Sequence, residues 1–210
     1  MTISITSLAN RALDLVGKDT FLDIETSTDS TARLVKRNFE PVLLRCLRKS
    51  DWPFALSRKS LNPDTVGPIN EFQYTYNLPS DFVKMTKTFD SWIRYKMEGP
   101  KRLVCDEQTL TVLYVNNKCL TDPSLMDPSF EEYFAHELAV SLTYKLSDSV
   151  NLRKELEQKA QLLFEEAAAM HSQEGTDDPL PASPWISTRY YDSPYIGPAG
   201  CTRLDWNLYE

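Results

Sequence analysis

The two histidines are the side chains best suited to acid–base or metal chemistry, so they bear first on whether the chain is an enzyme. His136-Glu137 begins like the zinc pattern H-E-x-x-H, but Val140 occupies the position of the second histidine, so one metal ligand is missing. His171 stands near the end of a predicted helix, where a cation is mildly favourable and needs no catalytic role. We therefore expect structural or surface histidines, and no Cys–His or Ser–His nucleophile.

The remaining reactive residue types show no catalytic or ligand-binding pattern either. The six glycines include no G-x-G-x-x-G and no P-loop, the two patterns that cradle phosphates. The paired carboxylates at 131–132 and 165–166 fall in predicted helices, where a charged outer face explains them. Asp177-Asp178 is interpreted as a solvated hinge and not as a calcium site. The four cysteines are far apart and form no C-x-x-C pair, which predicts reduced thiols without a zinc site or disulfide framework: Cys46, Cys105, Cys119 and Cys201. The sequence thus predicts a non-enzyme without cofactor or metal.

Charge and hydropathy exclude two further classes of function. The formal net charge is −7 and the isoelectric point is near 5.0, which disfavours a protein that binds the phosphate backbone of nucleic acids. No apolar run approaches the length of ~20 residues that a membrane span requires, and the first residues lack the pattern of a signal peptide. We expect solvated or intersubunit salt-bridge roles for one basic stretch: Arg45, Arg48, Lys49, Arg58 and Lys59.

Helical periodicity defines the first fifty residues. Apolar residues between Ile5 and Val16 fall on one face, and Gly17 follows as a helix stop. A second helix begins after the N-cap cluster at 27–30. Its buried side is predicted to contain Val35, Phe39, Val42, Leu43, Cys46 and Leu47. Pro41 interrupts this pattern, so the segment is either one kinked helix or two helices with Pro41 in the first turn of the second.

The hydrophobic period then changes to that of β-strands and later returns to that of helices. Short β-branched and aromatic segments occur at 72–79, 81–89, 92–97, 101–106 and 109–115, as expected for half-buried antiparallel strands. Asp127-Pro128 then offers an N-cap with proline at N1, opening a third helix with an inner stripe of Phe134, Leu138, Ser141 and Leu142. A fourth helix starts near Asn151, with a packing seam of Leu152, Leu156, Ala160, Leu163, Ala167 and Met170.

These elements predict an α+β fold: a four-helix bundle with an inserted antiparallel β-rich segment and an extended C-terminal arm. We place the N-terminal bundle helices at residues 1–51, the β-rich insertion at 52–124, the C-terminal bundle helices at 125–173 and the arm at 174–210. We expect Trp52 and Phe54 to pack the junction between the bundle and the β part.

The arm has an unusual composition for a terminal segment. It holds five prolines, which exclude a long helix, together with six aromatic residues, whereas disordered tails are poor in aromatics. A proline-stiffened strip rich in Trp and Tyr is typical of a segment that lies in a groove on a partner. The alternative is an arm that wraps over its own domain. The partner-binding prediction, to a portal or a neighbouring subunit, comprises Trp185, Tyr190, Tyr191, Tyr195 and Trp206.

The order of the motifs, taken together, resembles the tail tubular protein A family, the head-to-tail adaptors of short-tailed bacteriophages (podoviruses). The similarity covers about residues 5 to 172. Its most specific pieces are Pro41-Val42-Leu43-Leu44 leading to Trp52-Pro53-Phe54-Ala55, and Tyr76-Asn77-Leu78-Pro79-Ser80-Asp81. The arm after Gly175 matches no family pattern.

The resemblance implies a helical bundle with a β-rich insertion that assembles as a twelve-membered ring beneath the portal. It further implies contacts with a tail nozzle (tail tubular protein B) and tail fibres, a place in the virion tail after assembly in the host cytoplasm, and no membrane. Genomic DNA would pass through the channel without specific binding, which suits the acidic balance. Two alternatives stay open: a non-viral helical interaction module with a self-wrapped arm, and a phage-borne hydrolase.

Overall fold

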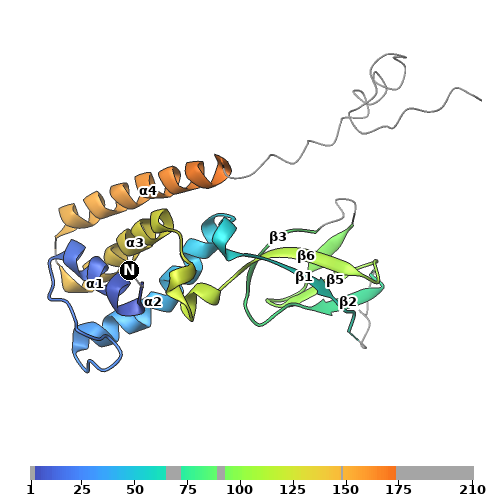
Figure 1. The fold of residues 1–210 in the computed structure, drawn as a ribbon, viewed down its shortest axis with the longest axis horizontal. Coiled ribbons are helices and arrows are strands. Elements are labelled where there is room, and N and C mark those ends of the chain that lie inside the picture. Colours follow the sequence, from blue (N-terminus) through green and yellow to red (C-terminus); the bar gives the residue numbers. More distant parts are fainter. Residues whose placement is uncertain (1–2, 65–71, 89–92, 148, 174–210) are drawn as a thin grey trace, which may run out of the picture. The chain divides into compact units, whose positions relative to one another are not determined.

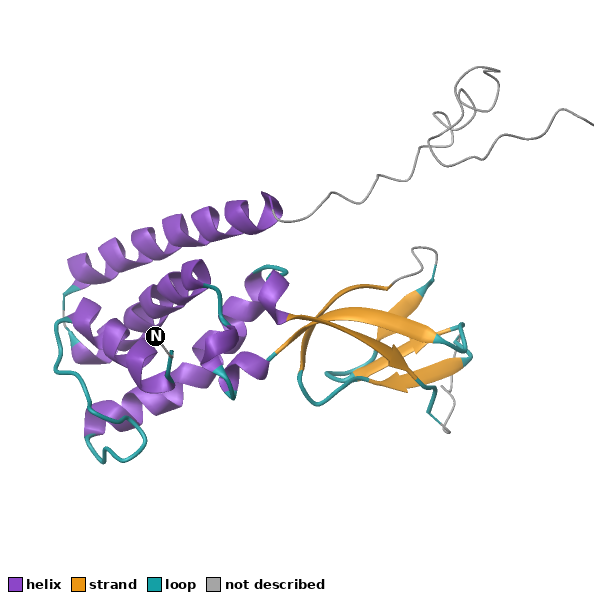
Figure 2. Ribbon diagram, viewed as in Figure 1, coloured by secondary structure: helices purple, strands orange, loops and turns teal. Residues whose placement is uncertain are grey.

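The computed structural model describes residues 3–64, 72–88, 93–147 and 149–173. The chain divides into two units, Met1–Glu174 and Gly175–Glu210, and the described residues all belong to the first. Its described residues form four α-helices and two small antiparallel sheets, in the order helix, helix, strands, helix, helix (Figures 1 and 2). The predicted α+β fold, a helical bundle with an antiparallel β insertion, is confirmed; the predicted arm at 174–210 lies outside the described residues.

The first two helices follow the sequence pattern closely. Helix α1 (Ile5–Val16) begins with a capping box in which Ser4 and Ser7 exchange hydrogen bonds, and it ends at Gly17 with φ +71°, a backbone conformation that favours glycine. Helix α2 (Ser30–Lys49) runs through Pro41 as one element, so the division into two helices is wrong. The six residues predicted for its inner side are all buried.

Helix α3 (Pro128–Leu146) is the centre of the bundle, because α1, α2 and α4 (Val150–Gln173) all pack against it. Asp127 caps it by accepting a bond from the Ser129 amide at 3.0 Å, and Pro128 stands at N1, as predicted. A helix enclosed by three others has no single inner stripe. Ser141 is only half-buried, whereas Phe130, Tyr133 and Ala139 are buried outside the predicted stripe.

The seam of helix α4 departs from the prediction at its end. Leu156, Ala160, Leu163 and Ala167 are buried as predicted, but Met170 is 57% exposed. His171 takes the inward position instead, with only 9% of its side chain exposed. A straight helix of 3.6 residues per turn drifts away from a strict heptad pattern, so the step after Ala167 leads to position 171.

The inserted strands form two three-stranded antiparallel sheets. One has the order β1 (Leu56–Leu61), β6 (Leu110–Asn116), β3 (Phe82–Thr88); the other has the order β2 (Tyr74–Asn77), β5 (Arg102–Cys105), β4 (Tyr95–Met97). Strand β1 was not predicted, while the other five lie within one residue of the predicted segments. Residues of both sheets share one apolar core: Leu61, Tyr76, Leu78, Leu103, Cys105, Leu110, Val112 and Tyr114.

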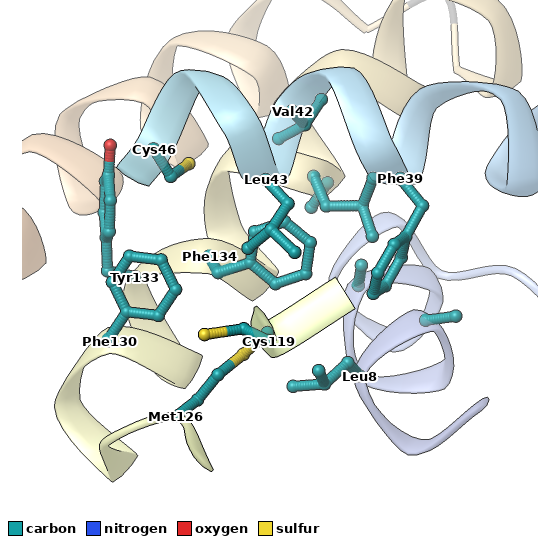
Figure 3. Close-up of a cluster of buried hydrophobic side chains, with 14 of the residues drawn as sticks. Leu8, Phe39, Val42, Leu43, Cys46, Cys119, Met126, Phe130, Tyr133 and Phe134 are labelled. Atoms are coloured by element: carbon teal, nitrogen blue, oxygen red, sulfur yellow. The ribbon is translucent and has the colours of Figure 1, made fainter. Parts of the chain in front are cut away.

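The larger core belongs to the bundle. Side chains from α1, α2, α3 and the connection at Cys119 and Met126 meet in it (Figure 3). Its members also include Trp52 and Ala55, from the segment after α2, and Val83 and Val115, from strands β3 and β6. The bundle core therefore continues into the first sheet. None of the described helices is apolar and long enough to cross a membrane.

Candidate interaction site

The five aromatic residues predicted to bind a partner, Trp185, Tyr190, Tyr191, Tyr195 and Trp206, lie outside the described residues. The structure does describe the end of α4, after which their segment begins. The last described residue, Gln173, follows His171 by two positions, and His171 packs on a cluster of aromatic rings.

This cluster, the aromatic junction, is centred on Trp52. The Trp52 ring is fully buried and lies 4.8 Å from the Phe130 ring and 5.3 Å from the His171 ring, both edge-to-face. Aromatic pairs at such distances stabilise beyond their buried area. The indole nitrogen donates to the carbonyl oxygen of Cys46 at 3.0 Å, which satisfies an acceptor in the last turn of α2. The junction comprises Trp52, Phe54, Phe130, Tyr133, Phe164 and His171.

Polar contacts beside the aromatic junction tie the bundle to the first sheet. Arg48 donates to the carbonyl oxygen of Val83 at 2.9 Å, and Lys84 pairs with Asp51 at 2.6 Å. The buried amide of Asn116 donates to the carbonyl oxygen of Ala55. Together with the shared core, these bonds make one continuous joint between helices and strands. The prediction that Trp52 and Phe54 pack between the bundle and the β part is confirmed.

Both histidines are packed inside the fold, in agreement with the expected structural role. His136 is 7% exposed, and its Nδ1 lies 2.9 Å from the carbonyl oxygen of Glu132 one turn earlier. His171 Nε2 lies 3.9 Å from the carboxylate of Asp127, the residue that caps α3. The carboxyl end of α4 is thereby placed beside the amino end of α3. Among the described residues no group of three or more potential ligands is arranged to hold a metal ion.

The predicted basic stretch does not form one patch. Arg45 and Lys49 both bind the carboxylate of Glu137, at 2.8 and 3.4 Å, and the Lys49 ammonium lies 4.4 Å from the centre of the Phe164 ring. Arg48 contacts the sheet as described. Arg58 and Lys59 are exposed and lie on β1, in the first sheet. The three cations on α2, Arg45, Arg48 and Lys49, therefore all have contacts within the chain.

A basic pocket that the sequence analysis missed lies at the opposite end of the bundle from the aromatic junction. It has a volume of about 420 Å³ and is formed by the first turns of α2 and the last turn of α3. Three exposed cations line it, Arg33, Arg37 and Lys145. The i, i+4 spacing of the two arginines was a detectable signal, but Lys145 is brought to them only by the fold. This α2–α3 basic pocket is lined by Ser30, Thr31, Arg33, Leu34, Arg37, Lys145 and Leu146.

One acidic residue contradicts the predicted charged outer face. Glu131 is only 8% exposed, and among the described residues its Oε1 has no hydrogen-bond partner. Burial raises the pKa of Glu131 above its ordinary value of 4.5, and the nearby Arg11 opposes this with a smaller effect. Glu132, in contrast, is half-exposed and pairs with Arg11 at 3.6 Å.

Replacing Glu131 with glutamine should therefore stabilise the protein at neutral pH. An acid with a raised pKa in the folded state contributes stability that is fully present below pH 4.5 and is lost as the pH rises through the folded pKa. Glutamine cannot lose a proton, so the advantage of the variant should grow from acid to neutral pH in urea unfolding. Glu132→Gln, which removes an exposed pair, should change stability by less than about 1 kcal/mol. An advantage of Glu131→Gln that is equally large at pH 4 would contradict this account.

The buried cysteines give a second testable consequence. Cys46, Cys105 and Cys119 are buried and not in disulfides, and burial raises the pKa of Cys46 to about 12 and that of Cys119 to about 11. Because the thiolate is the reactive form, these three thiols should resist a thiol reagent at pH 8 until the protein unfolds. The Cys201→Ser variant should then show almost no fast-reacting thiol in its native state. Rapid native modification of Cys46 or Cys119 would contradict the described core.

Comparison with known proteins gives no assignment by similarity. No model of a protein family matches the chain, and no curated protein matches it.

Proposed function

We propose that the chain is a structural head-to-tail adaptor of a short-tailed bacteriophage, which forms a ring between portal and tail nozzle, extends the DNA channel and helps to attach tail fibres. It resides in the virion tail at the portal vertex. Its function is geometric: it joins two assemblies at fixed positions, and no step of bond making or breaking is required of it.

The observation that carries the proposal is where the residues of the family resemblance lie. Trp52 and Ala55, from one quoted motif, belong to the joint between bundle and sheet. Asp81, from the other, accepts a hydrogen bond from the Tyr114 hydroxyl at 3.1 Å, and its carbonyl accepts one from the Asn117 amide at 3.0 Å. The quoted motifs thus contribute to the joint between bundle and sheet and to the connection that leaves β6. An adaptor that binds one partner at each end must be rigid at such positions.

The element order supports the same function. The resemblance implies a helical bundle with a β-rich insertion, and this is the order of the described unit. His171, a member of the aromatic junction, precedes the first residue of the arm by three positions, so the proposed partner-binding segment begins next in sequence to this junction. An adaptor holds its partners at fixed positions through rigid contacts of this kind.

The experiment that tests the proposal is the addition of the purified full-length chain to purified portal rings of the virus that encodes it. We expect the mass of the rings, measured by light scattering, to rise by twelve chains of 24.1 kDa each. The control is an equimolar unrelated acidic protein of similar size. Absence of binding, or a hydrolytic activity of the isolated chain on cell-wall material, would contradict the proposal.

A further inference from the structure

The α2–α3 basic pocket holds cations whose charge is not balanced within the described structure. No described carboxylate pairs with Arg33, Arg37 or Lys145, although seven other ion pairs are formed there. Asp29, four residues before Arg33, gives α2 no side-chain cap, so amide groups of the first turn of this helix add positive potential. A concave surface with three such cations attracts carboxylates or phosphates.

Two large exposed side chains stand close to Lys145 in sequence, at the end of α3 and the start of α4. Tyr144 is 75% exposed and Val150 is 66% exposed, and both line a second pocket of about 230 Å³ that adjoins Lys145 in sequence. Tyrosine and arginine are the residues that contribute most per residue at protein interfaces. Cations beside exposed apolar groups fit a peptide better than a bare phosphate.

The chain itself contains a segment of complementary charge. Residues 174–178 read Glu-Gly-Thr-Asp-Asp, with three carboxylates within five positions. The whole of residues 174–210 contains six acidic residues and two arginines. The segment therefore offers one carboxylate for each cation of the pocket.

The point where this acidic segment begins lies far from the pocket of its own chain. His171 lies beside Asp127, at the amino end of α3, whereas Lys145 stands at the carboxyl end of that helix. At 1.5 Å per residue, about 30 Å of helix separates Gln173 from Lys145. Asp178 follows Gln173 by five residues, which span at most about 18 Å when fully extended. The pocket of another copy is not subject to this limit.

We propose that the α2–α3 basic pocket of one copy binds the acidic segment 174–178 of a neighbouring copy, with Arg33, Arg37 and Lys145 as the cations that hold Glu174, Asp177 and Asp178. Such a contact joins different surfaces of the two copies, and heterologous contacts of this kind form a ring when the rotation between copies closes. The proposal rests on the proposed function, because it assumes that several copies assemble side by side.

The test is zero-length cross-linking in a mixture of unlabelled and ¹⁵N-labelled full-length chain, both alone at high concentration and with portal rings. A carbodiimide joins a carboxylate directly to an amine, so mass spectrometry should find Lys145 linked to Asp177 or Asp178 in peptides of mixed isotope content. Lys145→Arg keeps the charge but removes the amine, and should abolish that link. Lys145 links found only with unmixed isotope content, or no link from Lys145 to residues 174–178, would overturn the proposal.

A charge exchange provides the second measurement. The Arg33→Glu/Arg37→Glu variant should bind a labelled peptide of residues 174–180 about tenfold more weakly than the natural chain. The same variant should bind a peptide with Asp177→Lys and Asp178→Lys more tightly than the natural chain does. Equal affinity of both proteins, natural and variant, for both peptides would overturn the proposal. Displacement of the acidic peptide from the pocket by duplex DNA at physiological salt would also overturn it.

The two proposals fail separately. If the chain joins portal rings but Lys145 is not linked to residues 174–178 of another copy, the pocket assignment is wrong and the adaptor function stands. If the mixed links form in the free protein while no chain joins a portal ring, the pocket assignment stands and the adaptor function is wrong.

Discussion

Replacing Trp52 with alanine should lower the free energy of unfolding by about 4 kcal/mol, at the upper end of the range for core truncations. The Trp52 side chain is fully buried and contacts five other rings of the aromatic junction. Its removal leaves a cavity between bundle and sheet and also removes the donor to the Cys46 carbonyl. Urea unfolding followed by circular dichroism measures the change.

Two variants control this result. Trp52→Phe keeps an aromatic ring but not the indole N–H, and should cost roughly half as much. Trp185→Ala removes a tryptophan predicted to bind a partner, and should leave the unfolding midpoint unchanged. Equal destabilisation by Trp52→Ala and Trp185→Ala would contradict both the central place of Trp52 and the partner role of Trp185.

Removing residues 174–210 should weaken binding to portal rings by about a hundredfold or more, because large aromatic anchors dominate interface energies. The shortened chain should keep its helical circular dichroism signal and its unfolding midpoint, since it retains every residue of the two described hydrophobic cores. Binding is measured by light scattering with portal rings, and folding by thermal unfolding.

The matched control keeps the length of the arm and changes only its aromatic residues. Full-length protein with alanine at the five positions should bind portal rings nearly as poorly as the shortened chain: Trp185, Tyr190, Tyr191, Tyr195 and Trp206. If the shortened chain instead fails to fold, the arm wraps its own domain and the self-wrapped interaction module is the better account.

The features that the sequence predicted well are those with local causes. The end of α1 at Gly17 and the start of α3 at Asp127-Pro128 are set by residues within one turn. The buried side of α2 follows from helical spacing alone. Such signals need no knowledge of the partner element, so they can be detected from a single sequence.

The missed features depend on contacts between distant segments. Strand β1 has three exposed polar residues in a row, Arg58, Lys59 and Ser60, and it exists because residues 56–61 pair with 110–115 of β6. An edge strand of this kind shows no alternation of apolar and polar residues. Glu131 is buried because α3 is enclosed by three helices, and its sequence neighbours do not reveal that enclosure.

The basic pocket is intermediate between these cases. Arg33 and Arg37 share one face of a predictable helix, but nothing near them indicates Lys145, more than a hundred residues later in the chain. The net negative charge of the chain also gives no sign of a local basic surface, because net charge is a sum over all residues and does not show how the charges are distributed. A pocket of this kind can be recognised only when the packing of α2 against α3 is known.

The most direct test of the adaptor function is an image of portal rings incubated with the full-length chain. Electron microscopy should show a ring of twelve additional densities on one face of each portal ring, coaxial with its channel. Each density should accommodate the four-helix bundle and its two sheets. Portal rings without added density, or chains bound at scattered positions off the channel axis, would contradict the account.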